Sequence, residues 1–315
     1  MIARFFAALD EVRRGARLPE DAKLGLAVSG GPDSLALLLL AHALMPDRIA
    51  AASVDHGLRG ESALEAAMVA RVCAELGVPH EVLSVQVPQG NVQAEARLVR
   101  YAALGEWLDR AGLAALVTAH HADDQAETLI MRLNRGSGVA GLAGTRAVGR
   151  VPGSAQPLLR PLLGWRKAEL AGIVAEAGLA AVQDPSNSDA RFDRARLRAD
   201  LARTHWLDIE AVAASAGHLA DADAALDWAA AREWQDCVVK APMGLTYRPQ
   251  APRAIALRVI ARIVTELNGE APRGSAAARV FDSLLARQPA SIGNLVARAG
   301  SDGWTFAKAP ARRGS

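Results

Sequence analysis

Residues 24–44 read LGLAVSGGPDSLALLLLAHAL, in which a glycine-rich turn separates a short apolar run from a longer one. The first run has the length of a buried strand, and the second has the length of a helix. Glycines let the backbone turn so tightly that amide hydrogens at the start of the helix point at an anion. The stretch predicts a phosphate-binding loop that contacts a nucleotide through Ser29, Gly30, Gly31, Pro32, Asp33 and Ser34.

The loop has a carboxylate where other phosphate loops have a cation. It lacks the lysine of the Gly-x-x-x-x-Gly-Lys-Ser/Thr loop, so hydrolysis of a γ-phosphate is not the expected reaction. We expect Asp33 to bind Mg²⁺, because this ion prefers one or two carboxylates together with phosphate oxygens. The competing interpretation is that Asp33 or Ser34 only caps the helix.

Residues 23–120 alternate short apolar runs with amphipathic stretches, as a doubly wound, mostly parallel α/β sheet requires. The expected strands are Leu24–Val28, Ile49–Val54, Glu81–Val85 and Ala115–Thr118, and the helices that follow them are Asp33–Ala43, Ser62–Leu76, Val92–Ala111 and Asp124–Leu133. In such a sheet the ligand lies beyond the carboxyl ends of the strands, where Ser29, Asp55 and His120 fall. Adenosine contacts are expected from Ser53, His56 and Arg59, although His56 also fits a local turn.

The second half of the chain has a different pattern. Arg135–Gly153 is rich in glycine and predicts either a mobile functional loop or a plain connector. Beyond Arg191 the sequence is helical and alanine-rich, with strand-like alternation only in the last sixty residues or so. We therefore expect a catalytic domain over residues 1–204 and a second, mostly helical domain over residues 205–315.

The net charge of +2 is unevenly distributed along the chain. From Lys240 onward, twelve Lys or Arg stand against four Asp or Glu, a local charge of +8. A basic end of this kind suits a polyanion, since each neutralised phosphate releases counterions, although a solvated arginine face would have the same composition.

The segment Thr118–Thr128 reads TAHHADDQAET and contains the most informative polar residues. If it opens a helix, His120, Asp124 and Glu127 lie on one face and could hold a cationic substrate and accept its proton. Two other interpretations remain open. Asp124 and Glu127 fit a capping box with Asp124 as N-cap, and histidine with carboxylates could bind a transition metal.

The cysteine content and the hydropathy of the chain indicate the cellular compartment in which it works. Cys73 and Cys237 are far apart and form no Cys-x-x-Cys pair, which argues against a disulfide framework or a zinc ribbon. No apolar run approaches the ~20 residues of a membrane span, and Met1–Leu18 carries charges that a secretion signal lacks. The expected compartment is the cytoplasm.

Ser-Gly-Gly-x-Asp-Ser after a first strand resembles the PP-loop, or N-type ATP pyrophosphatase, superfamily. The string 118–128, Arg135–Gly138 and Gly141–Gly144 make the chain similar to the tRNA(Ile)-lysidine synthetase family within it. Further similar segments are Arg97–Tyr101, Arg160–Leu163 and Asp184–Asn187 with Phe192, Arg194 and Arg198. The resemblance covers residues 23 to about 200, and it departs from the family pattern at Ala195, where Asn is usual.

The resemblance implies an activity. The substrates would be ATP with Mg²⁺, free L-lysine and the wobble cytidine of a tRNA(Ile) with a CAU anticodon. Asp124 or Glu127 would bind the lysine ammonium with His120 and accept its proton, and Arg100 would neutralise phosphate charge unless it is only solvated at the surface. The tRNA phosphates would be contacted by Arg194 and Arg198, together with Arg191, Arg196 and Arg203. The region after Lys240 would hold the acceptor side of the tRNA.

Other members of the superfamily supply the rival interpretations. A tRNA thiolase would need paired cysteines, a small-molecule ligase would not need the basic end, and a tRNA-binding module without catalysis would not need the intact loop. The sequence leaves the oligomeric state open, with a homodimer among the options.

Overall fold

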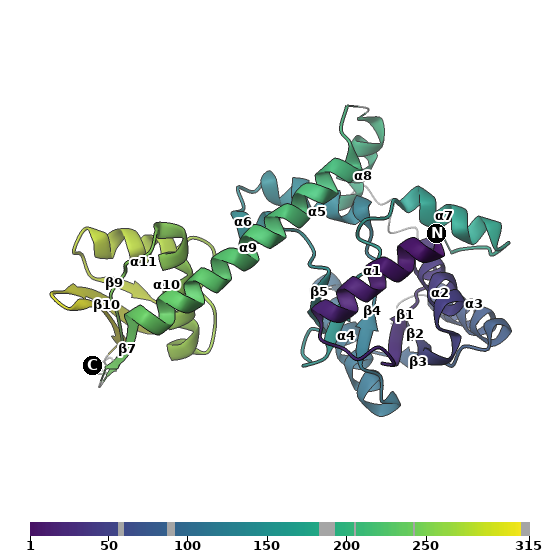
Figure 1. Ribbon diagram of the computed structural model, residues 1–315, viewed down its shortest axis with the longest axis horizontal. Helices are drawn as coiled ribbons and strands as arrows, with labels where there is room; N and C mark the ends of the chain where they lie inside the picture. The colour runs from purple at the N-terminus through teal and green to yellow at the C-terminus, as the bar shows by residue number, and fades with distance from the viewer. Residues whose placement is uncertain (56–59, 87–91, 183–192, 205, 242, 310–315) are drawn as a thin grey trace. The chain divides into compact units, whose positions relative to one another are not determined.

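The computed structural model describes residues 1–55, 60–86, 92–182, 193–204, 206–241 and 243–309, and Figure 1 shows their helices and strands. The chain divides into two compact units, Met1–Ala220 and Asp221–Ser315. Among the described residues, every helix is too short or too polar to cross a lipid bilayer.

The first unit is built on a six-stranded sheet with the order β3-β2-β1-β4-β6-β5. Its strands are β1 (Leu24–Ala27), β2 (Ile49–Asp55), β3 (His80–Ser84), β4 (Ala115–Val117), β5 (Val148–Arg150) and β6 (Pro157–Leu159). All neighbours pair in parallel except β5, which is antiparallel to β6 at the edge. The predicted mostly parallel α/β sheet is confirmed, and β5 and β6 are additions at one edge.

The helices follow the predicted alternation closely. They are α1 (Ile2–Gly15), α2 (Pro32–Leu44), a 3₁₀ turn η1 (Pro46–Arg48), α3 (Gly60–Leu76), α4 (Val92–Ala111), α5 (Ala122–Leu133), α6 (Val139–Leu142), α7 (Lys167–Glu176), α8 (Asp193–Arg203) and the long α9 (Ile209–Cys237). The glycine-rich segment contains α6 and β5, so it is not one long irregular loop.

The helices cover both faces of the sheet. Side chains from α1, α2, α3 and α7 share one apolar core with β1, and side chains from α4 share another with β2, β3, β4 and β6. α2 is apolar all round because it is buried between the sheet and neighbouring helices. Gly25 lets α4 approach β1, since a Cβ there would lie 2.5 Å from Leu108 and 2.6 Å from Trp107.

The second unit contains helices and an antiparallel sheet. The helices are the end of α9, α10 (Arg253–Asn268) and α11 (Ala276–Leu285). The five strands are β7 (Val238–Ala241), β8 (Gly244–Tyr247), β9 (Ala290–Ile292), β10 (Leu295–Gly300) and β11 (Gly303–Lys308), in the order β7-β8-β11-β10-β9. The helical character agrees with the prediction, and β7 and β8 lie earlier than the expected strand-like alternation.

The two units divide inside α9, and not near residue 204 as the sequence pattern predicts. The first turns of α9 belong to the first unit because Ala216 is fully buried there, close to Gly144. A change of composition marks the start of α8 and α9 but does not show where their packing partners change.

Candidate active site

The loop after β1 is held in one shape by the hydroxyl of Ser34. Ser34 Oγ donates a hydrogen bond to the Gly31 carbonyl oxygen at 3.0 Å and accepts one from the Ser29 amide at 3.1 Å. Gly30 has a φ of +83°, which glycine adopts at little cost. Gly31 is the N-cap of α2, and no side chain of the described residues caps the helix. The first amides of α2 are therefore available to an anion, and the interpretation of Asp33 or Ser34 as a simple cap is wrong.

Asp33 lies in the first turn of α2 with one carboxylate oxygen unused. Its Oδ2 lies 3.5 Å from Nε2 of His121, whereas Oδ1 is buried and has no hydrogen-bond partner among the residues that the structure describes. Such an oxygen fits the preference of Mg²⁺ for carboxylate ligands. In the described ranges, no three His, Cys, Asp or Glu side chains are grouped to hold a metal, so an ion at Asp33 would need further oxygen ligands from a nucleotide.

His121 is buried among three carboxylates. Its Nε2 lies 3.5 Å from both Asp33 Oδ2 and Asp124 Oδ2, and its Nδ1 lies 3.6 Å from Asp123 Oδ2. Burial favours the neutral ring, but hydrogen bonds to Asp123 and Asp33 and the nearby negative charges raise the pKa of His121 to about 9. The ring is therefore protonated at neutral pH, and it joins the phosphate loop to the start of α5.

His121 is also the N-cap of α5. Its amide donates to Asp124 Oδ2 at 3.2 Å, and the Asp124 amide reaches His121 Nδ1 at 3.4 Å. The second contact requires an unprotonated Nδ1, so it belongs to the neutral ring. The three carboxylates favour the protonated ring, whose Nδ1 lies 3.6 Å from Asp123 Oδ2. The hydrogen bond from the His121 amide to Asp124 Oδ2 does not depend on the state of the ring, so the start of α5 pairs His121 with Asp124, and the predicted box of Asp124 with Glu127 is wrong.

Asp123 anchors α7 to α5. Its Oδ2 accepts a hydrogen bond from the Lys167 amide at 2.8 Å, and its Oδ1 accepts one from Arg166 at 3.2 Å. Burial raises the pKa of Asp123, but His121, Lys167 and Arg166 together hold it well below its usual range. Sequence reasoning missed His121 and Asp123 as site residues. The signal was a histidine pair followed closely by two aspartates.

The carboxylates of Asp124 and Glu127 lie on one face of α5, and both are paired with arginines of α8. Arg194 donates to Glu127 Oε2 at 2.7 Å and to Asp124 Oδ1 at 2.8 Å. Arg198 donates to Glu127 Oε1 at 2.6 Å and to Oε2 at 3.0 Å. Burial of Glu127 raises its pKa, but the two arginines outweigh burial and lower it. The structure therefore joins four of the predicted site residues in one ion-pair network.

His120 lies just before α5 and does not share its face. Its Nδ1 is 2.9 Å from Thr118 Oγ1. Burial lowers the pKa of His120 to about 4; the negative charge of Asp124 opposes this, and Arg160 and Arg97 add to it. The ring is neutral at neutral pH and can exchange hydrogen bonds with a substrate. With Glu127 bound by arginines and the described side chains forming no metal cluster, the transition-metal interpretation fails.

Arg100 belongs to a group that we term the arginine cluster: Arg97, Arg100 and Arg160 around Tyr101. The guanidinium carbons of Arg97 and Arg100 lie 5.0 and 5.3 Å from the centre of the Tyr101 ring. Burial lowers the pKa of Arg100 and that of Arg160, while hydrogen bonds with Tyr101 oppose the shift. Arg100 is thus not a solvated surface residue. Its described contacts are within this cluster and not with the phosphate loop.

The predicted adenosine contacts are placed only in part. Ser53 is at the carboxyl end of β2, beside the phosphate loop, and its hydroxyl donates to the Val28 carbonyl oxygen at 2.8 Å. The same hydroxyl lies 3.0 Å from Nε2 of His80. Its side chain therefore joins neighbouring strands. His56 and Arg59 lie outside the described residues, as does the segment 183–192 with Arg191.

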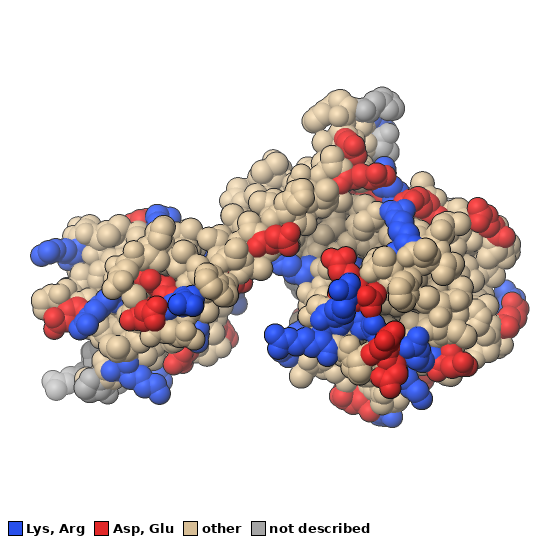
Figure 2. Space-filling model, in the orientation of Figure 1, with Lys and Arg blue, Asp and Glu red and all other residues tan. Residues whose placement is uncertain are grey.

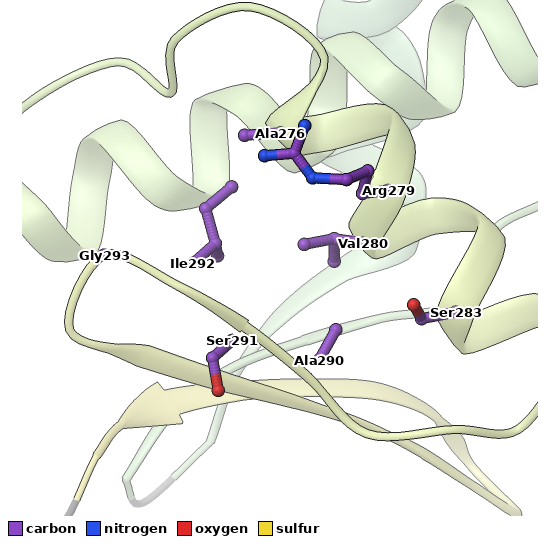
Figure 3. A pocket seen from close by; sticks show the side chains of 8 residues that line it. All are labelled: Ala276, Arg279, Val280, Ser283, Ala290, Ser291, Ile292 and Gly293. Atoms are coloured by element: carbon purple, nitrogen blue, oxygen red, sulfur yellow. The ribbon is translucent and has the colours of Figure 1, made fainter.

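The second unit has a hollow of about 370 Å³ between α11 and β9 (Figure 3). The residues that line it are Ala276, Arg279, Val280, Ser283, Ala290, Ser291, Ile292 and Gly293. None of the residues predicted for the active site is among them.

Comparison with known proteins agrees with this geometry. The family model described as the PP-loop domain matches residues 4–205. The chain is 51% identical to the tRNA(Ile)-lysidine synthase of Novosphingobium aromaticivorans, across 94% of this chain and 92% of that protein. It is 40% identical to the tRNA(Ile)-lysidine synthase of Zymomonas mobilis, across 94% and 91%.

A solved structure shares the fold. The U34-tRNA thiolase NcsA from Methanococcus maripaludis superposes with a TM-score of 0.52 at 17% identity, over 67% of this chain and 78% of that one. At this identity the likeness concerns the fold alone. From the phosphate loop, the acidic network and the two bacterial relatives together, we conclude that the chain belongs to the tRNA(Ile)-lysidine synthase family of PP-loop proteins.

Proposed function

We propose that this chain ligates L-lysine to C2 of the wobble cytidine in the CAU anticodon of tRNA(Ile) and converts ATP to AMP and pyrophosphate. The observation that carries the proposal is the contact between the phosphate loop and α5. Asp33 and Asp124 each lie 3.5 Å from the His121 ring. Phosphates bound at the loop of Asp33 and an ammonium group bound at Asp124 would therefore lie side by side. Membership of the family supports the choice of tRNA and lysine.

The chemistry requires two displacements. Oxygen O2 of cytosine is a poor leaving group, so it first attacks the α-phosphorus of ATP, and pyrophosphate leaves. The ε-amine of lysine then attacks C2 of the adenylated base, and the C2–O2 bond breaks to release AMP. The amine must lose a proton before or during this attack, and a carboxylate in reach can accept it.

The phosphate loop and Asp33 would serve the first displacement. The free amides at the start of α2, with Gly30 and Gly31, would bind the phosphates, and the backbone near Ser53 would lie beside the adenosine. Mg²⁺ at Asp33 Oδ1 would neutralise phosphate charge. The protonated His121 would hold Asp33 in place. Arg100 stays a candidate for a further cation at the phosphates.

Asp124 is the favoured base for the second displacement. It is closer to solvent than Glu127, whose side chain is 3% exposed and bound by two arginines. Arg194 and Arg198 each use Nε and Nη2 on these carboxylates, so close contacts with tRNA phosphates would compete with the ion pairs. We therefore propose that tRNA phosphates draw Arg194 and Arg198 away, and that the carboxylates then accept the lysine ammonium beside His120.

The second unit would contribute RNA affinity through its basic side chains, as the charge of +8 after Lys240 indicates. In the view of Figure 2, Lys and Arg side chains on this unit are interspersed with Asp and Glu. Binding by scattered cations would depend on salt and carry little sequence information. Because its substrates are tRNA and ATP, we expect the protein to act in the cytoplasm.

Sulfur transfer is not favoured as the alternative. Cys73 and Cys237 are both buried, and they lie in different units. Burial raises the pKa of Cys73 to about 11, which keeps it a thiol at neutral pH. A ligase for a small carboxylic acid would have no use for the basic second unit, and an inactive RNA-binding module would have no use for the acidic network.

We expect the purified protein to add lysine to unmodified CAU-anticodon tRNA(Ile) only when ATP and Mg²⁺ are both present. Mass spectrometry of the nuclease-digested tRNA would detect the lysine adduct at the wobble nucleoside. A reaction without ATP provides the control. A digest with no adduct, but with sulfur on a base or with a free acid consumed, would overturn the proposal.

A further inference from the structure

The arginine cluster holds positive charge that no described carboxylate balances. Arg160 is 8% exposed, yet among the described residues its guanidinium interacts only with the Arg146 carbonyl oxygen, at 2.6 Å, and with Tyr101. Its Nε is buried and has no hydrogen-bond partner among the described residues. Within the described residues, no carboxylate lies at ion-pair distance from Arg97, Arg100 or Arg160. An uncompensated buried guanidinium is costly, which indicates that an anion binds here.

The order of the strands places this anion site away from the ATP phosphates. The phosphate loop follows β1, and the adenosine side of the site lies toward β2. Arg160 directly follows β6, and β4 lies between β6 and β1. With strands ~4.8 Å apart, the carboxyl ends of β6 and β1 are roughly 10 Å from each other. Arg160 is therefore on the side of the crevice away from the nucleotide.

Asp124 lies between these two regions, because α5 follows the central strand β4. His120 is close to both kinds of charge: Asp124 raises its pKa, and Arg160 and Arg97 lower it. Extended lysine has its ε-nitrogen about 7 Å from its α-carboxylate, judging from standard bond lengths. A lysine with its ε-amine at Asp124 can thus direct its carboxylate toward the arginine cluster.

We propose that Arg97 and Arg160, aligned by Tyr101, bind the α-carboxylate of the lysine whose ε-amine reacts. This proposal rests on the proposed function and adds a site that selects amines with an α-carboxylate. Arginine suits the task because its planar guanidinium pairs with a carboxylate in a fixed geometry. A lysine derivative with a neutral group in place of the carboxylate would leave the guanidinium groups unpaired and would be rejected.

The test compares L-lysine with L-lysinamide, in which a neutral amide replaces the carboxylate. Arg97 is exposed, so Arg97→Gln should fold normally. We expect this variant to lower kcat/KM for lysine about 10- to 100-fold, since hydrogen bonds to charged groups are strong. The rate with lysinamide and the KM for ATP should not change. Arg160→Gln should have the same effect, with its folding checked by thermal unfolding.

Arg110→Gln is the matched control, because Arg110 is also on α4 but pairs with Glu81 at the surface. An equal loss with lysine and lysinamide, or a raised KM for ATP, would overturn the carboxylate site while leaving lysidine formation intact. If the wild-type protein modifies tRNA with neither amine, the proposed function fails, and this inference fails with it.

Discussion

Replacement of Asp33 by alanine is expected to lower the rate of AMP formation about 10³-fold, while binding of tRNA persists. Asp33 Oδ1 is buried at the phosphate loop and has no partner in the described part of the chain, so its loss removes the expected magnesium ligand and one partner of His121. The side chain makes no other described contact that would stabilise RNA binding. The measurements are pyrophosphate and AMP release with saturating substrates and a tRNA filter-binding titration.

Asp33→Asn separates charge from shape, because it keeps the size of the side chain and removes the negative charge. It should be nearly as inactive as the alanine variant. Asp47→Asn is the control, since Asp47 is an exposed acidic residue at η1. Full AMP formation by Asp33→Asn would contradict the assigned role. A variant that neither binds tRNA nor shows a cooperative unfolding transition would have a folding defect instead.

Glu127→Gln is expected to destabilise the first unit by about 2–3 kcal/mol at neutral pH and to abolish most lysidine formation. The change leaves Arg194 and Arg198 without their shared carboxylate. The expected destabilisation is smaller than that for breaking a fully buried ion pair, because both arginines reach solvent. Urea unfolding would measure the loss of stability, and a separate assay of lysidine formation would measure the loss of activity. Glu176→Gln, at the exposed end of α7, is the control.

The loss of stability in Glu127→Gln is expected to depend on pH in one direction only. The pKa of Glu127 is lowered in the folded protein from an ordinary value of 4.5. The stability from its ion pairs is therefore fully present above pH 4.5 and is lost as the pH falls through the folded-state pKa. The difference in unfolding free energy between wild type and variant should shrink below pH 4.5. A difference that stays constant into strong acid would contradict the ion-pair explanation.

The strands and helices around the phosphate loop could be predicted because each has a clear period and a clear boundary. Gly30, Gly31 and Pro32 mark the turn before α2, and the alternation as far as Leu133 matches the structure within a few residues. β5 and β6 were not predicted, since three residues are too few to establish a period. β7 and β8 are likewise short, at four residues each.

The candidate site was predictable where its residues are neighbours in sequence. His120, Asp124 and Glu127 are close together in one motif, and the parallel sheet places that motif beside Asp33. The pairing of Arg194 and Arg198 with Glu127 joins positions 67 and 71 residues apart, so no local spacing indicates it. The role of His121 as a buried cation likewise depends on Asp33, which approaches only in the folded chain.

In the proposed reaction ATP adenylates the wobble cytidine, and not the lysine carboxylate. The most direct test uses tRNA(Ile) whose wobble cytidine carries a heavy oxygen isotope at O2, incubated with the protein, ATP and unlabelled lysine. We expect the isotope to leave the tRNA and to appear in AMP as lysidine forms, as mass spectrometry of the nucleotide would show. Unlabelled AMP formed together with a lysine-containing product would contradict it.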